Sequence, residues 1–175
     1  MTDTDTVRLF TALWPDAAVR ARLVALRDGW RWPPGARPTA DAHLHATLHF
    51  IGSFRCDRLD ALQHALGTVA IEPFPIDLAG TLVWPGGIAI ARLAAEPALI
   101  ALHARLGVAL ADLGVALDAR PYQPHVTLAR KAAGAKPPAA LPVLAWRATG
   151  FALVASRGGA RSSYEVLATW NDADR

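Results

Sequence analysis

The pattern His-x-Thr-Leu occurs twice in this chain, as His45-Ala46-Thr47-Leu48 and as His125-Val126-Thr127-Leu128, 80 residues apart in 175. Both copies lie in apolar runs typical of strands. Side chains two positions apart on a strand point to the same face. Each copy therefore presents one imidazole and one hydroxyl to a common surface. One copy would mean little, but a repeat in each half of the chain favours catalysis over packing alone.

The other face of the first motif strand is expected to be apolar. Strict alternation places four hydrophobic side chains there, on the side that packs against a core: Leu44, Ala46, Leu48 and Phe50. The strand is expected to end at Gly52. This predicts a strand with one polar and one buried side.

Two imidazoles and two hydroxyls suit acid-base chemistry at a phosphodiester. Unperturbed histidine titrates near about 6.5, so one ring can accept a proton while the other donates one. In-line attack by water requires both roles. The threonine hydroxyls, with a nearby cation, could hold the non-bridging phosphate oxygens. Such a reaction needs no metal or other cofactor.

Composition limits the class of protein. The chain is 53% hydrophobic and 19% charged, as in globular proteins. A net charge of +3 without a Lys or Arg run argues against a broad nucleic-acid surface and fits a local phosphate site. Cys56 has no second cysteine to pair with, and the start lacks the features of a signal peptide. We expect one soluble, cytoplasmic domain over residues 1–175, with no membrane span.

Periodicity and turn residues predict an α+β chain in the approximate order β-α-β-α-β-β-α-β-β-β. Helices are expected to begin at Pro15, at Asp57 and at Glu96. The loop 32–38 contains Trp32 and Arg37, which could overhang a cleft or serve ordinary loop packing. Besides the two motif strands, the expected strands are 7–14, 74–84, 88–93, 143–147, 151–156 and 164–170, the last two joined by 157–161.

The twin motifs resemble the signature of the 2H phosphoesterase superfamily. Three further stretches are similar to the bacterial and archaeal RNA 2′,3′-cyclic phosphodiesterases, also called the 2′-5′ RNA ligase family: 8–13, 124–130 and 156–167. The resemblance spans nearly the whole chain. It implies a bilobal fold, with two pseudo-symmetric lobes of antiparallel sheet, outer helices and a central cleft where the motifs face each other.

The resemblance also implies an activity and a set of roles. The family hydrolyses 2′,3′-cyclic phosphates at RNA 3′ ends to 2′-phosphates. His45 would protonate the departing 3′ oxygen and His125 would activate water, while Thr47 and Thr127 bind the phosphate. Arg130 would add positive charge, although strict alternation puts it on the face opposite His125 unless the strand bulges or ends there. RNA ends or cyclic nucleotides are the implied partners, and a monomer is expected.

Three aromatic residues near the motifs leave alternatives open. His43 and His49 depart from the family pattern and would share a face with His45, where they could bind zinc or lower the pKa of His45 by like-charge repulsion. Tyr122 could stack on a base or pack in the core. Two more histidines, His64 and His103, lie on expected helices and are interpreted as surface or edge residues.

Other functions remain possible at this level. The chain could act on ADP-ribose cyclic phosphate or on 2′-5′ oligonucleotides, or could bind RNA ends without turnover. A zinc protein built on the His43 face is a third possibility. ATP-dependent ligation is not supported, because the sequence contains no P-loop and no nucleotidyl-transfer lysine motif.

Overall fold

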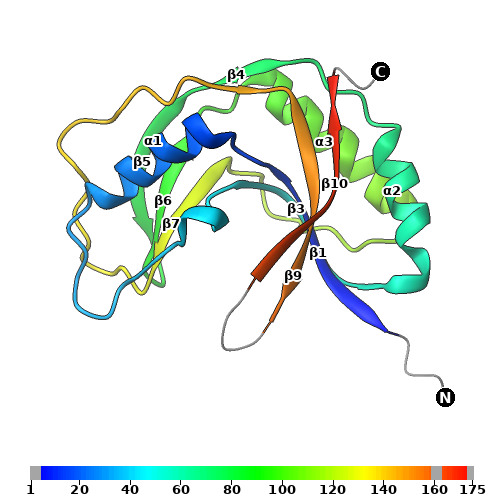
Figure 1. Ribbon diagram of the computed structural model, residues 1–175, viewed down its shortest axis with the longest axis horizontal. Helices are drawn as coiled ribbons and strands as arrows, with labels where there is room; N and C mark the ends of the chain where they lie inside the picture. The colour runs from blue at the N-terminus through cyan, green and yellow to red at the C-terminus, as the bar shows by residue number, and fades with distance from the viewer. Residues whose placement is uncertain (1–4, 159–162, 173–175) are drawn as a thin grey trace.

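The computed structural model describes residues 5–158 and 163–172. It consists of a strongly curved, largely antiparallel sheet with helices packed on it, and the sheet order is β10-β9-β1-β3-β7-β6-β5. Figure 1 shows two groups of strands that meet where β3 lies beside β7. The bilobal α+β fold expected from the sequence is confirmed.

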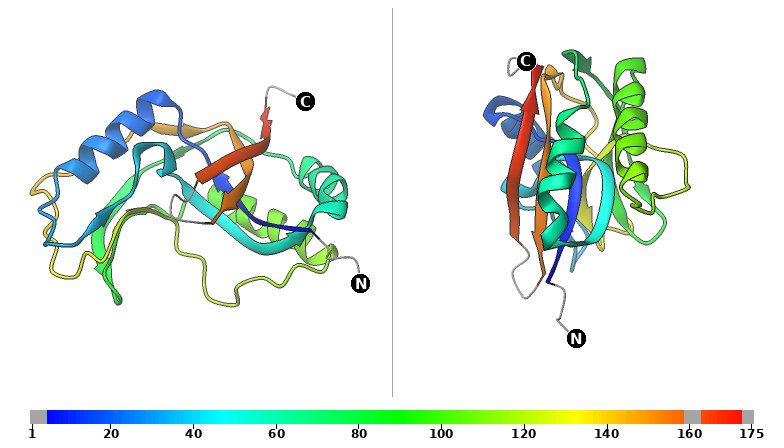
Figure 2. Two further views of the ribbon diagram at one scale, coloured as in Figure 1. Left: turned by 60° about the horizontal axis from the view of Figure 1, so that its bottom comes forward. Right: turned by 90° about the vertical axis from the view of Figure 1, so that its right-hand side faces the viewer.

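One lobe is formed by strands from both ends of the described chain. Its strands are β1 (Thr6–Leu13), β3 (Ala46–Arg55), β9 (Gly150–Arg157) and β10 (Ser163–Asn171). Two helices lie beside this lobe, α2 (Leu59–Gly67) and α3 (Pro97–Asp112), as the right-hand view of Figure 2 shows. The four residues 159–162, in the expected connection between β9 and β10, lie outside the described residues.

The other lobe is formed by the middle of the chain. Its strands are β5 (Leu78–Trp84), β6 (Ile88–Leu93) and β7 (His125–Arg130), with the short strand β2 (Arg37–Pro38) paired to β7. The helix α1 (Ala17–Asp28) lies over this lobe (Figure 1). The short strands β4 (Phe74–Ile76) and β8 (Trp146–Ala148) form a separate two-stranded sheet.

Apolar residues at helical spacing hold the helices on the sheet. In α1, Asp16 caps the N-terminus by accepting a 2.8 Å hydrogen bond from the Val19 N–H. Apolar side chains of α1 and α3 are buried in one continuous core with the apolar face of β3: Val19, Leu23, Leu26, Leu99, Leu102, Leu106 and Leu110. The helices therefore pack on the side of the sheet that carries the apolar residues of β3.

Three expected boundaries were wrong. β3 does not end at Gly52 but continues to Arg55, since Gly52 adopts φ +76° at a register shift opposite β1. The strand expected at 74–84 is interrupted at Asp77, because its first part leaves the main sheet to pair with β8. Part of the loop 32–38 forms β2, which extends the edge of β7. β5 and β6 pair in antiparallel register across the turn 85–87.

No helix among the described residues is long and apolar enough to cross a bilayer.

Candidate active site

The two motifs meet at the junction of the lobes. Ala46 on β3 pairs with Val126 on β7 in antiparallel register, and both side chains are fully buried. By this register His45 lies across from Thr127, and Thr47 lies across from His125. The Ala46–Val126 pair is thus the centre of a local two-fold arrangement, which places the histidines diagonally on the face of the sheet opposite the helices. We call this side the motif face.

Both imidazoles are oriented in the same way. Nδ1–H of His45 donates to the carbonyl oxygen of His43 at 2.7 Å, and Nδ1–H of His125 donates to the carbonyl oxygen of Gln123 at 2.7 Å. A carbonyl oxygen only accepts hydrogen bonds, so each contact fixes the proton of the neutral ring on Nδ1. Nε2 is then the nitrogen left for chemistry in both copies. In the first copy Nε2 of His45 lies 3.0 Å from Oγ1 of Thr47, which can donate to it.

A β-bulge follows each motif at its leucine. On β3 the partners of Thr47 and His49 are the adjacent residues Ala12 and Thr11, so Leu48 is the extra residue. On β7 the partners of Thr127 and Ala129 are adjacent residues of β6, so Leu128 is the extra residue. Burial repeats accordingly: residues 44–50 and residues 124–130 follow the same alternation of buried, half-buried and exposed positions.

The second bulge places Arg130 on the motif face. After Leu128 the alternation is shifted by one, so Arg130 is exposed on the side of His125 and not on the opposite side. Its charge contributes to lowering the pKa of His125, after burial, which is the larger cause. The bulge that the role of Arg130 requires is therefore present.

The first bulge overturns two expectations about β3. Phe50 does not join Leu44, Ala46 and Leu48 in the core but is 68% exposed, at the position that matches Arg130. His49 turns towards α3, where its ring stacks on His103 at a centroid distance of 3.9 Å. The prediction that His43, His45 and His49 share one face is wrong, and so is the possible zinc site on that face. No cluster of three or more potential metal-ligating side chains occurs in the described part of the chain.

His45 lies deeper in protein than a surface histidine. Its ring stacks on Phe10 and Trp14 at centroid distances of 4.9 and 5.4 Å, and the edge of Tyr164 approaches at 5.5 Å. The pKa of His45 is lowered to about 4, mainly by burial and to a smaller extent by the charges of His43, His125 and Arg20. The expected influence of His43 on His45 is confirmed, as a smaller effect than burial. Both motif imidazoles are therefore neutral at pH 7 in the free protein.

Sequence reasoning missed the aromatic residues around His45. Phe10 lies on β1 and Trp14 follows directly after that strand, and Tyr164 reaches the same small apolar cluster from β10. On the other side of the junction Trp84 meets the His125 ring at 4.5 Å. The spacing of Phe10, Ala12 and Trp14 along β1 and just past its end was the available signal, but only the fold brings these residues beside β3.

Tyr122 is not among these aromatic side chains. Its ring stacks on His103 at 3.9 Å, and its hydroxyl donates to the carbonyl oxygen of Thr47 at 3.1 Å. It is half-buried against the main core, and burial raises its pKa. The structure thus places Tyr122 in a packed position directly behind the motif. His103 is half-buried in the same stack, whereas His64 is exposed as expected.

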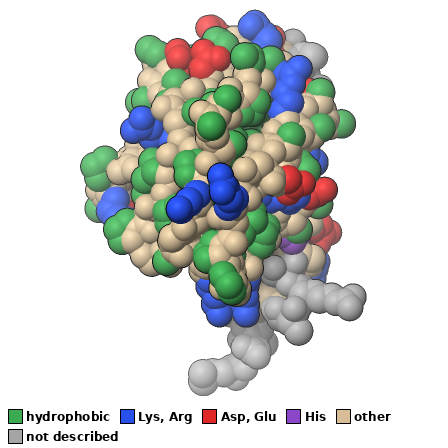
Figure 3. All heavy atoms as spheres, turned by 90° about the vertical axis from the view of Figure 1, so that its left-hand side faces the viewer, with side chains coloured by type: hydrophobic (Ala, Val, Ile, Leu, Met, Phe, Trp, Pro, Cys, Tyr) green, Lys and Arg blue, Asp and Glu red, His purple; other side chains and the backbone are tan. Residues whose placement is uncertain are grey.

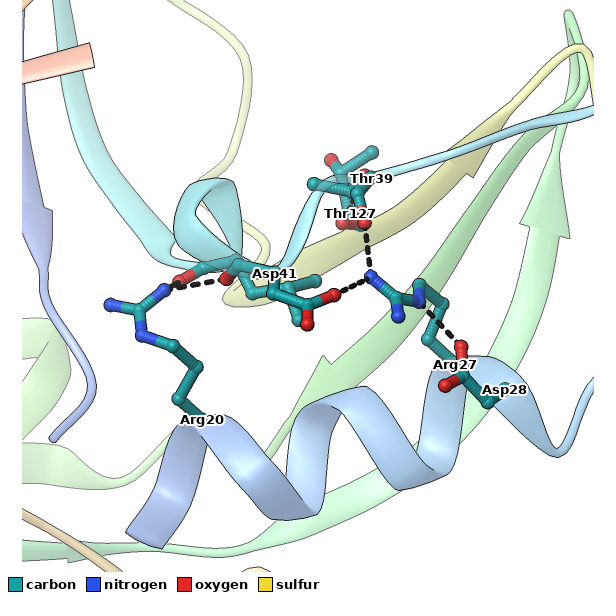
Figure 4. Close-up of polar contacts among 7 residues, drawn as sticks. Arg20, Arg27, Asp28, Thr39, Asp41 and Thr127 are labelled. Atoms are coloured by element: carbon teal, nitrogen blue, oxygen red, sulfur yellow. Dashed lines mark hydrogen bonds and ion pairs between the residues drawn. The ribbon is translucent and has the colours of Figure 1, made fainter. Parts of the chain in front are cut away.

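A polar network on α1 holds the segments that precede and flank the motifs. Arg20 donates to the carbonyl oxygens of Asp41 (2.7 Å) and Leu44 (3.3 Å), just before His45. Arg27 donates to the carbonyl oxygen of Thr39 at 2.5 Å and to Oδ1 of Asp41 at 2.6 Å (Figure 4). The backbone around both motifs is thereby tied to one helix.

Comparison with known proteins agrees with this geometry. Residues 14–160 match the model of the 2′-5′ RNA ligase superfamily. The chain is 36% identical to an RNA 2′,3′-cyclic phosphodiesterase of Thermus thermophilus, over 86% of this chain and 82% of that protein. The Escherichia coli protein of the same description is 31% identical, over 93% and 95%. The crystal structure of E. coli LigT in apo form superposes with a TM-score of 0.79 at 28% identity, covering 95% and 98% of the two chains. This chain belongs to the 2′-5′ RNA ligase superfamily.

Proposed function

We propose that this protein is an RNA 2′,3′-cyclic phosphodiesterase that opens cyclic phosphates at RNA 3′ ends, or on nucleotides, to 2′-phosphates. The observation that carries the proposal is the diagonal placement of two His-Thr pairs about Ala46 and Val126. Relatives from T. thermophilus and E. coli bear the description RNA 2′,3′-cyclic phosphodiesterase. Solved structures of E. coli LigT, which this chain resembles, contain 3′-AMP or phosphate.

Two proton transfers make up the proposed reaction. Nε2 of neutral His125 takes a proton from water as the water oxygen attacks phosphorus. The bond between phosphorus and the 3′ oxygen breaks, and the His45 imidazolium gives its Nε2 proton to that oxygen. The 2′ ester bond remains, so the product is a 2′-phosphate. Since imidazoles handle both protons, we propose that the reaction needs no metal and no cofactor.

The surroundings of the histidines support this division of roles. Burial is the main cause that lowers the pKa of His45 to about 4, so its imidazolium gives up a proton more readily than an ordinary one. A bound anionic phosphate would favour the protonation of His45 before the chemical step. The lowered pKa of His125, from burial and then from the charge of Arg130, keeps that ring neutral and able to act as a base.

Four side chains are proposed to hold the substrate. Thr47 and Thr127 lie two residues after the histidines and would donate hydrogen bonds to the non-bridging oxygens. Arg130 would add a charge-assisted contact. The ring of Tyr164, half-buried beside His45, would face the nucleoside. Tyr122 is proposed to support Thr47 and not to touch substrate.

Because each lobe supplies one motif, we propose that residues 1–175 act as one bilobal domain. We also propose that it works as a monomer in the cytoplasm, since each protomer carries both histidines. Gel filtration at assay concentrations tests the monomer.

The test of the proposed function is hydrolysis of nucleoside 2′,3′-cyclic phosphates in EDTA, with the product identified by phosphorus NMR. A 2′-phosphate product is expected, and His64→Ala on the exposed face of α2 should match the wild type. A 3′-phosphate product contradicts the proposed mechanism. Preference for ADP-ribose cyclic phosphate or a 2′-5′ oligonucleotide identifies another superfamily activity, and binding without turnover identifies an RNA-end binding module.

A further inference from the structure

Two arginines face each other at the edge of the motif face. Arg37 on β2 is directly opposite Arg130 on β7, and both side chains are exposed. Directly opposite residues of antiparallel strands project to the same side, with Cβ atoms about 4.5–5.5 Å apart. Since the bulge at Leu128 puts Arg130 on the motif face, it puts Arg37 there as well. We call these two residues the arginine pair.

Like charges placed opposite each other destabilise a sheet. Neither member of the arginine pair takes part in an ion pair within residues 5–158 and 163–172. Asp41, which lies on the same segment as Arg37, is paired with Arg27. On the end of the molecule shown in Figure 3, Lys and Arg side chains lie across the centre and acidic side chains lie towards the margin. An anionic ligand would offset the unfavourable pairing.

The backbone that carries Arg37 is fixed to the second motif. The Thr39 N–H donates to the carbonyl oxygen of Leu128 at 2.8 Å, and Oγ1 of Thr39 donates to the carbonyl oxygen of Thr127 at 2.9 Å. Arg27, 8% exposed, holds the Thr39 carbonyl from the other side, as Figure 4 shows. Arg37 is therefore held at a defined distance from Thr127 and is not carried on a free loop.

The position of Arg37 relative to the histidines suggests its ligand. β6 occupies one edge of β7, so β2 and β3 share the other edge. Arg37 lies opposite residue 130, and His45 lies across from residue 127. Three residues of strand span about 10 Å at most. Arg130 can thus reach the reacting phosphate, while Arg37 lies beside Arg130 on the neighbouring edge strand, at the same level along the sheet.

We propose that Arg37, next to Arg130, binds the phosphodiester that precedes the 3′-terminal nucleotide. This inference rests on the proposed function and specifies its substrate class: an oligoribonucleotide end is preferred to a mononucleotide. Arg37 contributes binding to the chain behind the cyclic phosphate and has no part in the chemical step.

The test compares two substrates, uridine 2′,3′-cyclic phosphate and a short oligouridylate ending in the same cyclic phosphate. Wild type should show the higher kcat/KM on the oligonucleotide. The kcat/KM of Arg37→Ala should fall about tenfold on the oligonucleotide and should not change on the mononucleotide. In a plot of log kcat/KM on the oligonucleotide against log salt concentration, the slope should become shallower by about 0.7, the value for the loss of one contact to a single-strand phosphate. Arg147→Ala, exposed on β8 outside the main sheet, is the matched control and should match wild type on both.

The mononucleotide rate of Arg37→Ala reports whether the variant is folded and chemically competent. Unchanged activity of Arg37→Ala on the oligonucleotide overturns the inference. An equal loss on both substrates also overturns it, because Arg37 would then serve the reacting phosphate or the fold. If wild type hydrolyses neither substrate, the proposed function is rejected, and the inference about Arg37 is rejected with it.

Discussion

The Tyr122 hydroxyl donates a hydrogen bond to the carbonyl oxygen of Thr47, 3.1 Å away and 75 residues earlier in the chain. This bond ties the segment leading into the second motif to the backbone of the first. The ring that carries the hydroxyl is itself fixed by stacking on His103 of α3. The placement of Thr47 on the motif face thus depends on groups that lie behind the motif.

Tyr122→Phe removes this bond and keeps the aromatic stack. We expect kcat to fall about three- to tenfold with KM little changed, since one neutral hydrogen bond contributes about 0.5–1.5 kcal/mol. Steady-state kinetics on a cyclic mononucleotide measure kcat and KM separately. Wild-type kcat in this variant would show that the bond does not position the motif.

The bulge at Leu48 is stabilised by a hydrogen bond to Thr11. Its fully buried Oγ1 accepts a 3.1 Å hydrogen bond from the His49 N–H. Thr11→Val leaves that buried N–H without an acceptor, so we expect a loss of about 1–3 kcal/mol in the free energy of unfolding. Urea denaturation measures it, and Thr169→Val at an exposed position of β10 is the control. Equal stability of the two variants would contradict the role of Thr11.

The pH dependence of catalysis should reflect two lowered pKa values. In the proposed mechanism the reactive form has a proton on His45 and none on His125. Burial is the largest cause that lowers both pKa values below the ordinary 6.5. The maximum of kcat/KM should therefore lie below pH 6.5 and decline above it, while kcat, with the phosphate anion bound, should peak at higher pH. A kcat/KM that rises continuously to pH 8 would contradict this assignment.

Substitution of His43 should change the pH profile of kcat/KM through the pKa of His45 alone. Its charge is one of the causes that lower the pKa of His45, and its backbone carbonyl, which holds Nδ1 of His45, survives substitution. His43→Gln should shift the alkaline limb of kcat/KM upward in pH without loss of the maximum rate. An unshifted limb would mean that burial alone sets the pKa of His45.

Stability should fall in acid because of the stack behind the motif. Burial lowers the pKa of His103 to about 4 and also lowers that of His49. The unfolded chain then binds more protons than the folded one between about pH 6.5 and pH 4, so the free energy of unfolding decreases as pH falls through that window. His103→Gln should weaken this dependence, and His64→Gln should not. The same pH dependence of the free energy of unfolding in wild type, His103→Gln and His64→Gln would contradict this role of His103.

The sequence predicts the elements that depend on local pattern. Leu99 to Leu110 recur at helical spacing, Asp16 caps α1, and Pro85-Gly86-Gly87 turns a hairpin, so all three are found where pattern and turn chemistry place them. The two motifs were recognisable for the same reason, because a histidine and a threonine two residues apart define a strand face without tertiary information.

Alternation fails where the strands bulge. Nothing local distinguishes Leu48 and Leu128 as extra residues, since the bulges are set by pairing with β1 and β6. The bulge at Leu48 sends His49 to α3 and Phe50 to solvent, and the bulge at Leu128 brings Arg130 to the side of His125. The aromatic neighbours of His45 escape prediction because Phe10 and Tyr164 lie more than 30 residues from it in sequence.

The most direct test of the two-histidine account is a double-mutant cycle. Rates in EDTA on a cyclic nucleotide would be measured for wild type, His45→Ala, His125→Ala and the double variant. Groups that act as a unit are strongly non-additive. Each single variant should lose about 10²–10⁴-fold, and the double variant should be little slower than the worse single one. Independent, multiplicative losses, or a near-wild-type rate in either single variant, would contradict the claim that the diagonal histidines share one acid-base mechanism.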